Sequence, residues 1–272
     1  MDLSTIILII FVILALQPML TARISSMQRM AAIRAIEKAQ STRVITMIHR
    51  QEQRSLFGFA VARHIDLEDA QTIITAIKRT PDIMPIDLVL HTPGGLVLAA
   101  MQIARAVEAH PARVRVFVPV YAMSGGTLIA LAADEIVLGE FSVLGPIDPQ
   151  LMGFPAASIV RARDAKPASD VHDLTMVLAD MSEKALAQVK RGAAELMSAR
   201  LGEDRALALA ERLAGGHYTH DYALTCSEAE QIGLPVKQDM PAEIMELMKL
   251  YPQPLQRSGV EYIPLDIPNR RA

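Results

Sequence analysis

The chain has 272 residues, of which 51% are hydrophobic and 21% are charged. A chain of this length and composition can bury a full core, so we expect one large folded domain with appendages. The formal net charge of −3 supplies no basic field for nucleic acid phosphates, which argues against that class of partner. A single cysteine, Cys226, excludes an internal disulfide and suits a reducing compartment.

The N-terminal segment is predicted to be a short membrane anchor. Every residue from 6 to 16 is apolar, and Leu3, Met19 and Leu20 extend the stretch towards the ~17-residue lower limit of a spanning helix. Asp2 is the only charge ahead of this stretch, and the basic residues follow it. The positive-inside rule then gives a single-pass protein with its N-terminus outside and the rest of the chain in the cytoplasm. A signal-peptide core or a buried helix is the alternative.

Strand-like and helix-like segments alternate regularly after the basic linker. Strands are predicted, in chain order, at 43–49, 56–62, 86–90, 114–118, 135–138 and 233–236. Helices are predicted at 66–81, 96–110, 128–133, 171–201, 203–213 and 222–232. An ordered loop is expected at 142–150, where glycine and prolines favour turns, and an extended Pro-rich tail at the C-terminus.

The predicted strands are apolar almost throughout, which indicates a mostly parallel α/β sheet covered by helices on both faces. Ligands bind such sheets at the carboxyl ends of the strands. Two glycine pairs fall at such ends, one in His91–Gly95 and one in Tyr121–Thr127. The second pair directly follows Ser124, at a predicted strand-to-helix junction.

A serine at this position is a candidate nucleophile, because unpaired N–H groups of the helix start and of a neighbouring glycine turn could stabilise an oxyanion. Taken alone, a Gly-Gly pair after a strand is more often a tight turn than an active site, and a serine at a helix start is more often an N-cap. The two motifs together favour the active site.

The seven histidines include one close pair, His217 and His220, beside Asp221. Because the sequence identifies no further ligands for this pair, we interpret it as structural. We predict no metal site and no cofactor.

The motifs His91-Thr-Pro-Gly-Gly95, Tyr121–Thr127, Ala132–Ile136 and Gly145–Asp148 occur in an order that resembles the Clp/crotonase superfamily of serine peptidases. Within it the chain looks like the serine dehydrogenase proteinase family, a relative of signal peptide peptidase A. The resemblance implies a Clp/crotonase-like ββα superhelix and assembly into a homo-oligomer. It covers roughly residues 43–240, the predicted peptidase domain. We expect an anchor (1–22) and a basic juxtamembrane linker (23–42) before this domain, and a C-terminal helix with a Pro-rich tail (241–272) after it.

The resemblance also implies Ser124 as nucleophile, with an oxyanion hole formed by the N–H of Gly125 and that of Gly94 or Gly95. Clp proteases carry their histidine in a His-Gln-Pro context, whereas this chain reads Ile147–Gln150 there and has no histidine. Relatives of signal peptide peptidase A use a lysine further along the chain.

Lys166 lies in the corresponding window and is our predicted base, with His172 as the alternative. A lysine base must be neutral, so its pKa has to fall from ~10.4 towards 7 to 8, and burial in a closed cleft would achieve this.

The predicted function is therefore that of a membrane-anchored serine endopeptidase with a Ser-Lys dyad, which cleaves membrane-protein or juxtamembrane segments. Two alternatives stay open. A crotonase-type acyl-CoA enzyme would use the same glycine N–H groups for a thioester, and a non-catalytic membrane-tethered scaffold would use the glycine turns only for packing.

Overall fold

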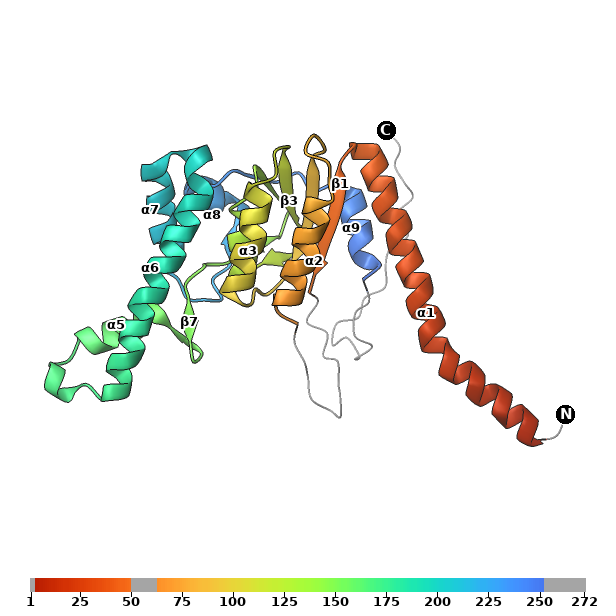
Figure 1. Cartoon of the computed structure of the whole chain (residues 1–272), viewed down its shortest axis with the longest axis horizontal. Helices are drawn as coiled ribbons and strands as arrows, with labels where there is room; N and C mark the ends of the chain where they lie inside the picture. Colours follow the sequence, from red (N-terminus) through yellow and green to blue (C-terminus); the bar gives the residue numbers. More distant parts are fainter. Residues whose placement is uncertain (1–2, 50–62, 252–272) are drawn as a thin grey trace.

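The computed structural model describes residues 3–49 and 63–251. Its centre is a five-stranded parallel sheet of β1 (Arg43–Ile48), β2 (Ile86–His91), β3 (Val114–Val118), β5 (Glu135–Leu138) and β10 (Val236–Lys237), in that spatial order. The predicted parallel α/β architecture is confirmed (Figure 1). The strand predicted at 56–62 and the Pro-rich tail from 252 onwards lie outside the described residues.

Side chains of the central strands alternate between two apolar clusters, one on each face of the sheet. In β3, Val116 faces a cluster with α2 (Leu67–Lys78), α3 (Val97–Glu108) and α4 (Gly125–Ala130), as Figure 1 shows for α2 and α3. Phe117 faces the other cluster, to which α1 (Leu3–Gln40) and α9 (Ala242–Lys249) contribute. The sheet is therefore buried on both faces, which explains its nearly continuous apolar strands.

The start of α2 follows the sequence signal closely. Asp66 caps the helix by accepting a hydrogen bond from the backbone N–H of Asp69, and the Asp69 carboxylate accepts one from the N–H of Asp66. This reciprocal capping box satisfies two backbone donors that the first turn leaves unpaired.

Two small sheets include parts of the predicted loop at 142–150. One contains β4 (Tyr121–Ala122), β6 (Val143–Leu144) and β9 (Leu224–Thr225), in that order. The other is a hairpin of β7 (Gln150–Leu151) and β8 (Phe154–Pro155).

The C-terminal half of the domain contains α5 (Ala156–Asp164), a short 3₁₀ turn (Ala168–Asp170), α6 (Asp173–Leu201), α7 (Glu203–Ala214) and α8 (Cys226–Gln231). Figure 1 shows α5 and the start of α6 projecting away from the sheet. Helix α5 was not predicted. The helix predicted at 222–232 begins later, because β9 precedes it and Thr225 forms a capping box with Glu228.

The N-terminal residues form one continuous helix that includes both the predicted anchor and the predicted linker. Ile36, near its C-terminal end, is 6% exposed and belongs to the core. The sequence predicts a membrane-spanning anchor here, whereas within the part of the chain that the structure describes no helix has the length and apolar character needed to cross a membrane.

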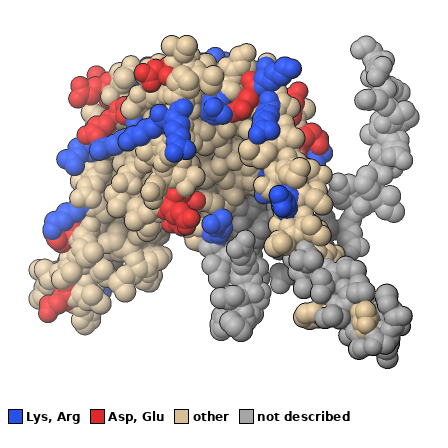
Figure 2. All heavy atoms as spheres, turned by 45° about the vertical axis from the view of Figure 1, so that its right-hand side comes forward, with Lys and Arg blue, Asp and Glu red and all other residues tan. Residues whose placement is uncertain are grey.

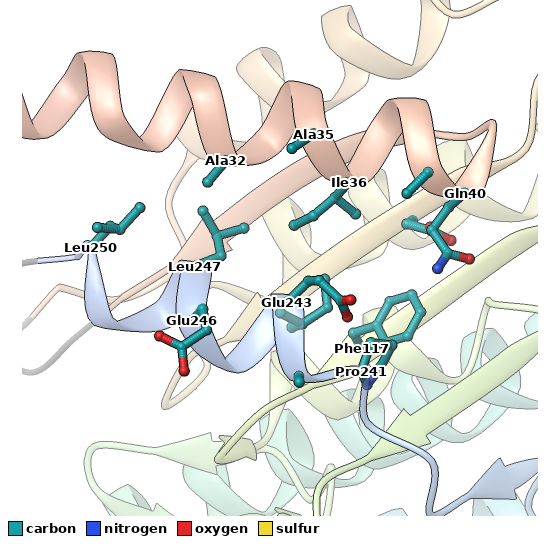
Figure 3. A pocket seen from close by; sticks show the side chains of 14 residues that line it. Ala32, Ala35, Ile36, Gln40, Phe117, Pro241, Glu243, Glu246, Leu247 and Leu250 are labelled. Carbon is teal, nitrogen blue, oxygen red and sulfur yellow. The ribbon is translucent and has the colours of Figure 1, made fainter. Parts of the chain in front are cut away.

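A cavity of about 560 Å³ lies between α1 and α9. Figure 3 shows Ala32, Ala35 and Ile36 along its α1 wall and Leu247 and Leu250 on the α9 side. The walls are mainly apolar, and Phe117 and Asp87 reach the cavity from the sheet.

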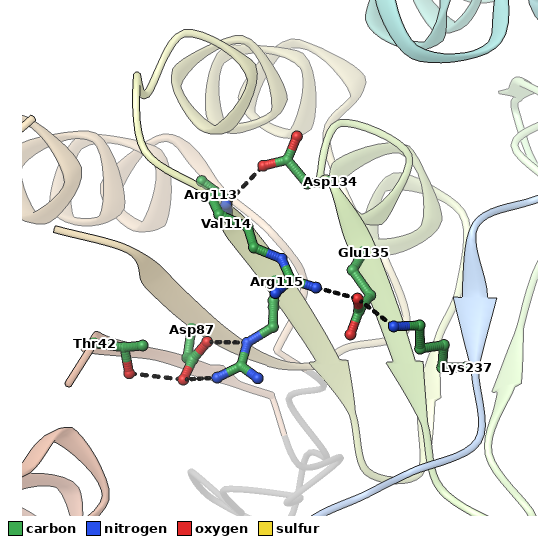
Figure 4. A network of polar contacts seen from close by, with 8 residues as sticks. All are labelled: Thr42, Asp87, Arg113, Val114, Arg115, Asp134, Glu135 and Lys237. Carbon is green, nitrogen blue, oxygen red and sulfur yellow. Dashed lines mark hydrogen bonds and ion pairs between the residues drawn. The ribbon is translucent and has the colours of Figure 1, made fainter. Parts of the chain in front are cut away.

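Hydrogen-bonded charged side chains cross-link the strands on the sheet face that packs against α1 and α9 (Figure 4). Arg115 donates two hydrogen bonds to the Asp87 carboxylate, both of 2.8 Å, and the Thr42 hydroxyl donates a third of 2.7 Å. Asp87 has a side chain that is only 1% exposed, so this charge depends on its partners. In contrast, the surface in Figure 2 carries Lys and Arg interspersed with Asp and Glu.

We expect Arg115→Met to lower the free energy of unfolding by about 3–5 kcal/mol, because it leaves the buried Asp87 carboxylate uncompensated. Arg113→Met is the matched control, directly before the same strand: Arg113 is 54% exposed, and its partner Glu135 keeps an ion pair with Lys237. The control should cost less than about 1 kcal/mol. Equal losses in urea unfolding would contradict the buried-charge argument.

The pKa of the Glu135 carboxyl lies below its ordinary value. Burial raises this pKa, but the hydrogen bonds and positive charges of Lys237 and Arg113 outweigh that effect. A carboxyl with a lowered folded-state pKa stabilises the fold above its unfolded-state pKa, and this stabilisation is lost as the pH falls through the folded-state value. The destabilisation caused by Glu135→Gln, measured by urea unfolding, should therefore be full at neutral pH and shrink below the ordinary pKa of 4.5. A constant difference down to acid pH would refute this expectation.

Candidate active site

The two glycine-rich motifs meet at the carboxyl ends of neighbouring strands, as predicted. Thr92, which follows β2, donates its backbone N–H to the Tyr121 carbonyl, and the Thr92 carbonyl accepts a hydrogen bond from the N–H of Met123. Thr92 and Ala122 thus form a parallel bridge. These bonds join the two turns directly before Gly94 and Ser124.

Ser124 lies in a strained backbone conformation between β4 and α4. Its φ of 50° and ψ of −117° lie outside the regions that a non-glycine residue ordinarily adopts. It occupies the N-cap position of α4, yet its side chain makes no capping hydrogen bond. A strained serine at a strand-to-helix turn is the geometry of a nucleophile elbow, which presents the hydroxyl outward.

The close approach of the two turns requires glycine at two positions. A Cβ on Gly94, which has a φ of +102°, would lie 2.7 Å from the Cβ of Ser124. A Cβ on Gly95 would lie 2.3 Å from the backbone N and O of Ile65. No side chain fits at either position without moving backbone.

The backbone N–H groups of these turns differ in their partners. The Gly94 N–H donates to the Thr92 hydroxyl oxygen at 3.1 Å. The Gly95 N–H and the Gly125 N–H have no hydrogen-bond partner among the residues that the structure describes. Gly125 is the first residue of α4, where a helix leaves its N–H unpaired. Of the predicted oxyanion groups, Gly95 and Gly125 therefore have free donors and Gly94 does not.

A partly buried arginine binds the backbone beyond the opposite end of α4. Arg200 on α6 donates hydrogen bonds to the carbonyl oxygens of Leu131, Ala132 and Leu196. Burial lowers the pKa of this guanidinium. The backbone carbonyls after α4 thus gain the partners that a helix end leaves missing.

A cavity of about 340 Å³ opens over Ser124. Its lining combines the glycine turns with apolar groups and two histidines: His64, Pro93, Gly95, Val97, Ser124, Gly125, Leu128, Ile147, Asp148, Pro149, Gln150, Val189 and His220.

His220 and Asp148 form a hydrogen-bonded pair in this cavity. The Nδ1 of His220 lies 2.9 Å from Oδ1 of Asp148, whose side chain is 1% exposed. The Gln150 amide donates to the other carboxylate oxygen at 2.7 Å. An ionised carboxylate only accepts hydrogen bonds, so the Nδ1 of His220 carries the proton and Nε2 keeps its lone pair.

The small β4-β6-β9 sheet brings these residues together. Ser124 follows β4, Asp148 follows β6 and His220 precedes β9, each by a few residues. The sequence alone favours a structural role for His220, whereas the structure places this residue in the cavity beside Ser124. The chain order Ser, Asp, His is the order of the α/β-hydrolase triad, and that was the signal that could have identified the pair.

The structure does not bring the two predicted bases to this cavity within one chain. Lys166 is exposed in the turn after α5, and His172 is exposed immediately before α6. Neither lines the cavity over Ser124. His64 does line it, but the described residues give His64 no carboxylate partner.

No group of three His, Cys, Asp or Glu side chains in the described ranges could hold a metal ion.

We expect Gly94→Ala to destabilise the fold more than Gly153→Ala. Both residues have positive φ, +102° and +82°, but a Cβ at Gly153 meets nothing within 4 Å. Gly153→Ala should thus cost only the backbone strain, about 1–2 kcal/mol, whereas Gly94→Ala adds a clash with Ser124. Equal free energies of unfolding would argue against the close packing of the two turns.

Comparison with known proteins identifies a family for this chain. A family model described as ClpP-like SDH-type serine proteinase matches residues 1–272. Two proteins of Methanocaldococcus jannaschii, both described as uncharacterized, are similar along most of their length. MJ0137 is 47% identical over 260 residues, covering 95% of this chain and 91% of the relative. MJ1495 is 45% identical over 254 residues, covering 93% and 87%.

A solved structure of a mutant 1510-N membrane-bound stomatin-specific protease is 22% identical, with a TM-score of 0.42, and the match covers 69% of this chain and 79% of that one. The full-length family match confirms the resemblance that the sequence motifs indicated: the chain belongs to the ClpP-like SDH-type serine proteinase family.

Proposed function

We propose that the protein is a serine peptidase in which Ser124 is the nucleophile, His220 the general base and Asp148 the residue that orients the base. One observation carries this proposal. A strained serine, two unpaired backbone N–H groups and a carboxylate-bound histidine line a single cavity. These are the three parts that acyl transfer to a serine requires.

The chemistry begins when the Nε2 of His220 takes the proton of the Ser124 hydroxyl as its oxygen attacks the peptide carbonyl carbon. The carbonyl oxygen becomes an oxyanion that accepts hydrogen bonds from the N–H of Gly95 and of Gly125. His220 then gives its proton to the leaving amine, and an acyl-enzyme remains. Water repeats the sequence, releases the carboxylic acid and restores the hydroxyl.

His220 is preferred over Lys166 because of its surroundings. The buried Asp148 holds the imidazole in the tautomer that a base needs. A neutral lysine needs desolvation, and Lys166 is exposed beside Arg163, Asp164 and Glu183, which are ion-paired to one another. The dyad with Lys166 is retained as the competing assignment that the experiment below tests.

Cleavage of juxtamembrane segments and assembly into a homo-oligomer stay predictions. The first depends on an N-terminal anchor, for which the described helices give no support. The crotonase-type alternative shares the oxyanion geometry, but it has no use for the paired His220 and Asp148.

The test is fluorophosphonate labelling together with hydrolysis of a casein or a peptide library. Ser124→Ala should abolish labelling, and His220→Ala should lower kcat by about 10⁴-fold or more. Asp148→Asn should cost about 10⁴-fold, because it removes the acceptor that fixes the tautomer. Ser124→Ala should unfold near the wild-type midpoint, and near-UV circular dichroism should show that His220→Ala and Asp148→Asn remain folded although each loses a hydrogen bond at the buried Asp148.

His217→Ala is the matched control for His220, because His217 lies three residues earlier with a 58% exposed side chain. His217→Ala and Lys166→Ala should keep wild-type turnover. If Lys166→Ala abolished turnover while His220→Ala retained it, Lys166 would be the base. Binding of acyl-CoA without labelling of Ser124 would support the crotonase-type enzyme instead.

A further inference from the structure

A second buried histidine lies behind the active site, outside the cavity lining. His49 follows β1 and is 3% exposed. Its Nδ1 lies 3.0 Å from the hydroxyl oxygen of Thr92, and its Nε2 lies 3.2 Å from Oδ2 of Asp69 at the start of α2. The peptidase mechanism above makes no use of this histidine.

The hydrogen bonds that join Asp69, His49 and Thr92 form one chain with a single donor-to-acceptor direction. The Asp69 carboxylate accepts from the Nε2–H of His49, so Nδ1 is the acceptor and the Thr92 hydroxyl donates to it. The Thr92 oxygen in turn accepts the N–H of Gly94 at 3.1 Å. Thr92 is 0% exposed, so water does not replace any of these partners. The chain Asp69, His49, Thr92 ends on the backbone of the glycine turn.

Hydrogen bonds from Thr92 and from Ile65 fix two successive peptide planes of that turn. The Thr92 hydroxyl holds the plane between Pro93 and Gly94 through the Gly94 N–H. The Ile65 N–H holds the next plane by donating to the Gly94 carbonyl at 2.8 Å. The second plane also contains the Gly95 N–H, which points opposite to that carbonyl. Glycines adopt many conformations, so the direction of this donor depends on such anchors.

We propose that Asp69, His49 and Thr92 are positioning residues that aim the Gly95 N–H at the oxyanion. This inference rests on the proposed peptidase function. None of the three touches the substrate. An oxyanion donor acts in the transition state, so its misplacement lowers kcat and leaves KM unchanged. Complete loss of one donor costs about 10²–10³-fold in kcat, and misplacement should cost about 10–100-fold.

Thr92 offers a matched pair of variants. Its methyl group packs beside Gly126, where an added Cβ would lie 2.6 Å away. Thr92→Val keeps that methyl and removes the hydroxyl, whereas Thr92→Ser keeps the hydroxyl and removes the methyl. We expect Thr92→Val to lose about 10–100-fold in kcat at constant KM, and Thr92→Ser to stay within about 3-fold of wild type. A purely structural role in packing would reverse this order.

His49→Leu tests the hydrogen-bonded chain at the residue next to Thr92. Alone it should lower kcat about as much as Thr92→Val, and the double variant should lose no more than either single variant, because both break the same chain. Affinity for a peptide aldehyde, which forms an oxyanion on Ser124, should fall in parallel. Binding of an uncleaved peptide, measured with Ser124→Ala in the same backgrounds, should not change.

The Gly94 amide gives a readout that needs no activity. Its hydrogen exchange, followed by NMR, should be slow in wild type and Thr92→Ser and at least about 10-fold faster in Thr92→Val and His49→Leu. An inactive, unlabelled wild type would refute the peptidase proposal, and the exchange rates would then decide whether the chain fixes the turn. Wild-type kcat in folded Thr92→Val, or additive losses in the double variant, would overturn the inference.

Discussion

The contact between the Gly94 backbone and Ser124 is the constraint on which the rest of the site depends. The two turns come this close because Gly94 has no side chain, while the absence of a side chain at Gly95 lets the Ile65 backbone approach the same turn. A Cβ on Gly125 would also meet Ala100 at 2.9 Å. The same approach puts two unpaired N–H groups beside the serine. The strained Ser124 thus lies between the Thr92–Ala122 bridge and α4, and the Arg200 side chain binds the backbone beyond the far end of that helix.

The residues around the serine come from chain segments that only the fold brings together. The β4-β6-β9 sheet has strands of two residues, yet it aligns the segments that carry Ser124, Asp148 and His220. Behind it, the start of α2 reaches the glycine turn through Ile65 and Asp69. The site thus belongs to the junction between the main sheet and this small one, and no single motif contains it.

Features with a local cause were predictable from the sequence. The central strands and α2 follow from apolar runs and from the Asp66 cap, and Ser124 follows from two glycine pairs at strand ends. The pair of His220 and Asp148 was not predicted, because its members are 72 residues apart and no periodicity links them. The prediction of Lys166 as the base rests on its spacing from Ser124 in a family resemblance, and spacing does not show that the Lys166 side chain is exposed. Helix α5 was missed because its apolar positions are few, with only Ala156 and Ala157 buried.

Because side chains alternate across the main sheet, the two cavities lie on opposite faces of it. The cavity between α1 and α9 lies against the Phe117 face, whereas the cavity over Ser124 is lined from α3 and α4 on the opposite face. The larger and more apolar of the two is the one without the serine. A small-molecule screen scored by binding alone would therefore collect compounds for the α1–α9 cavity, and only a screen read out at the proposed nucleophile would select compounds for the cavity over Ser124.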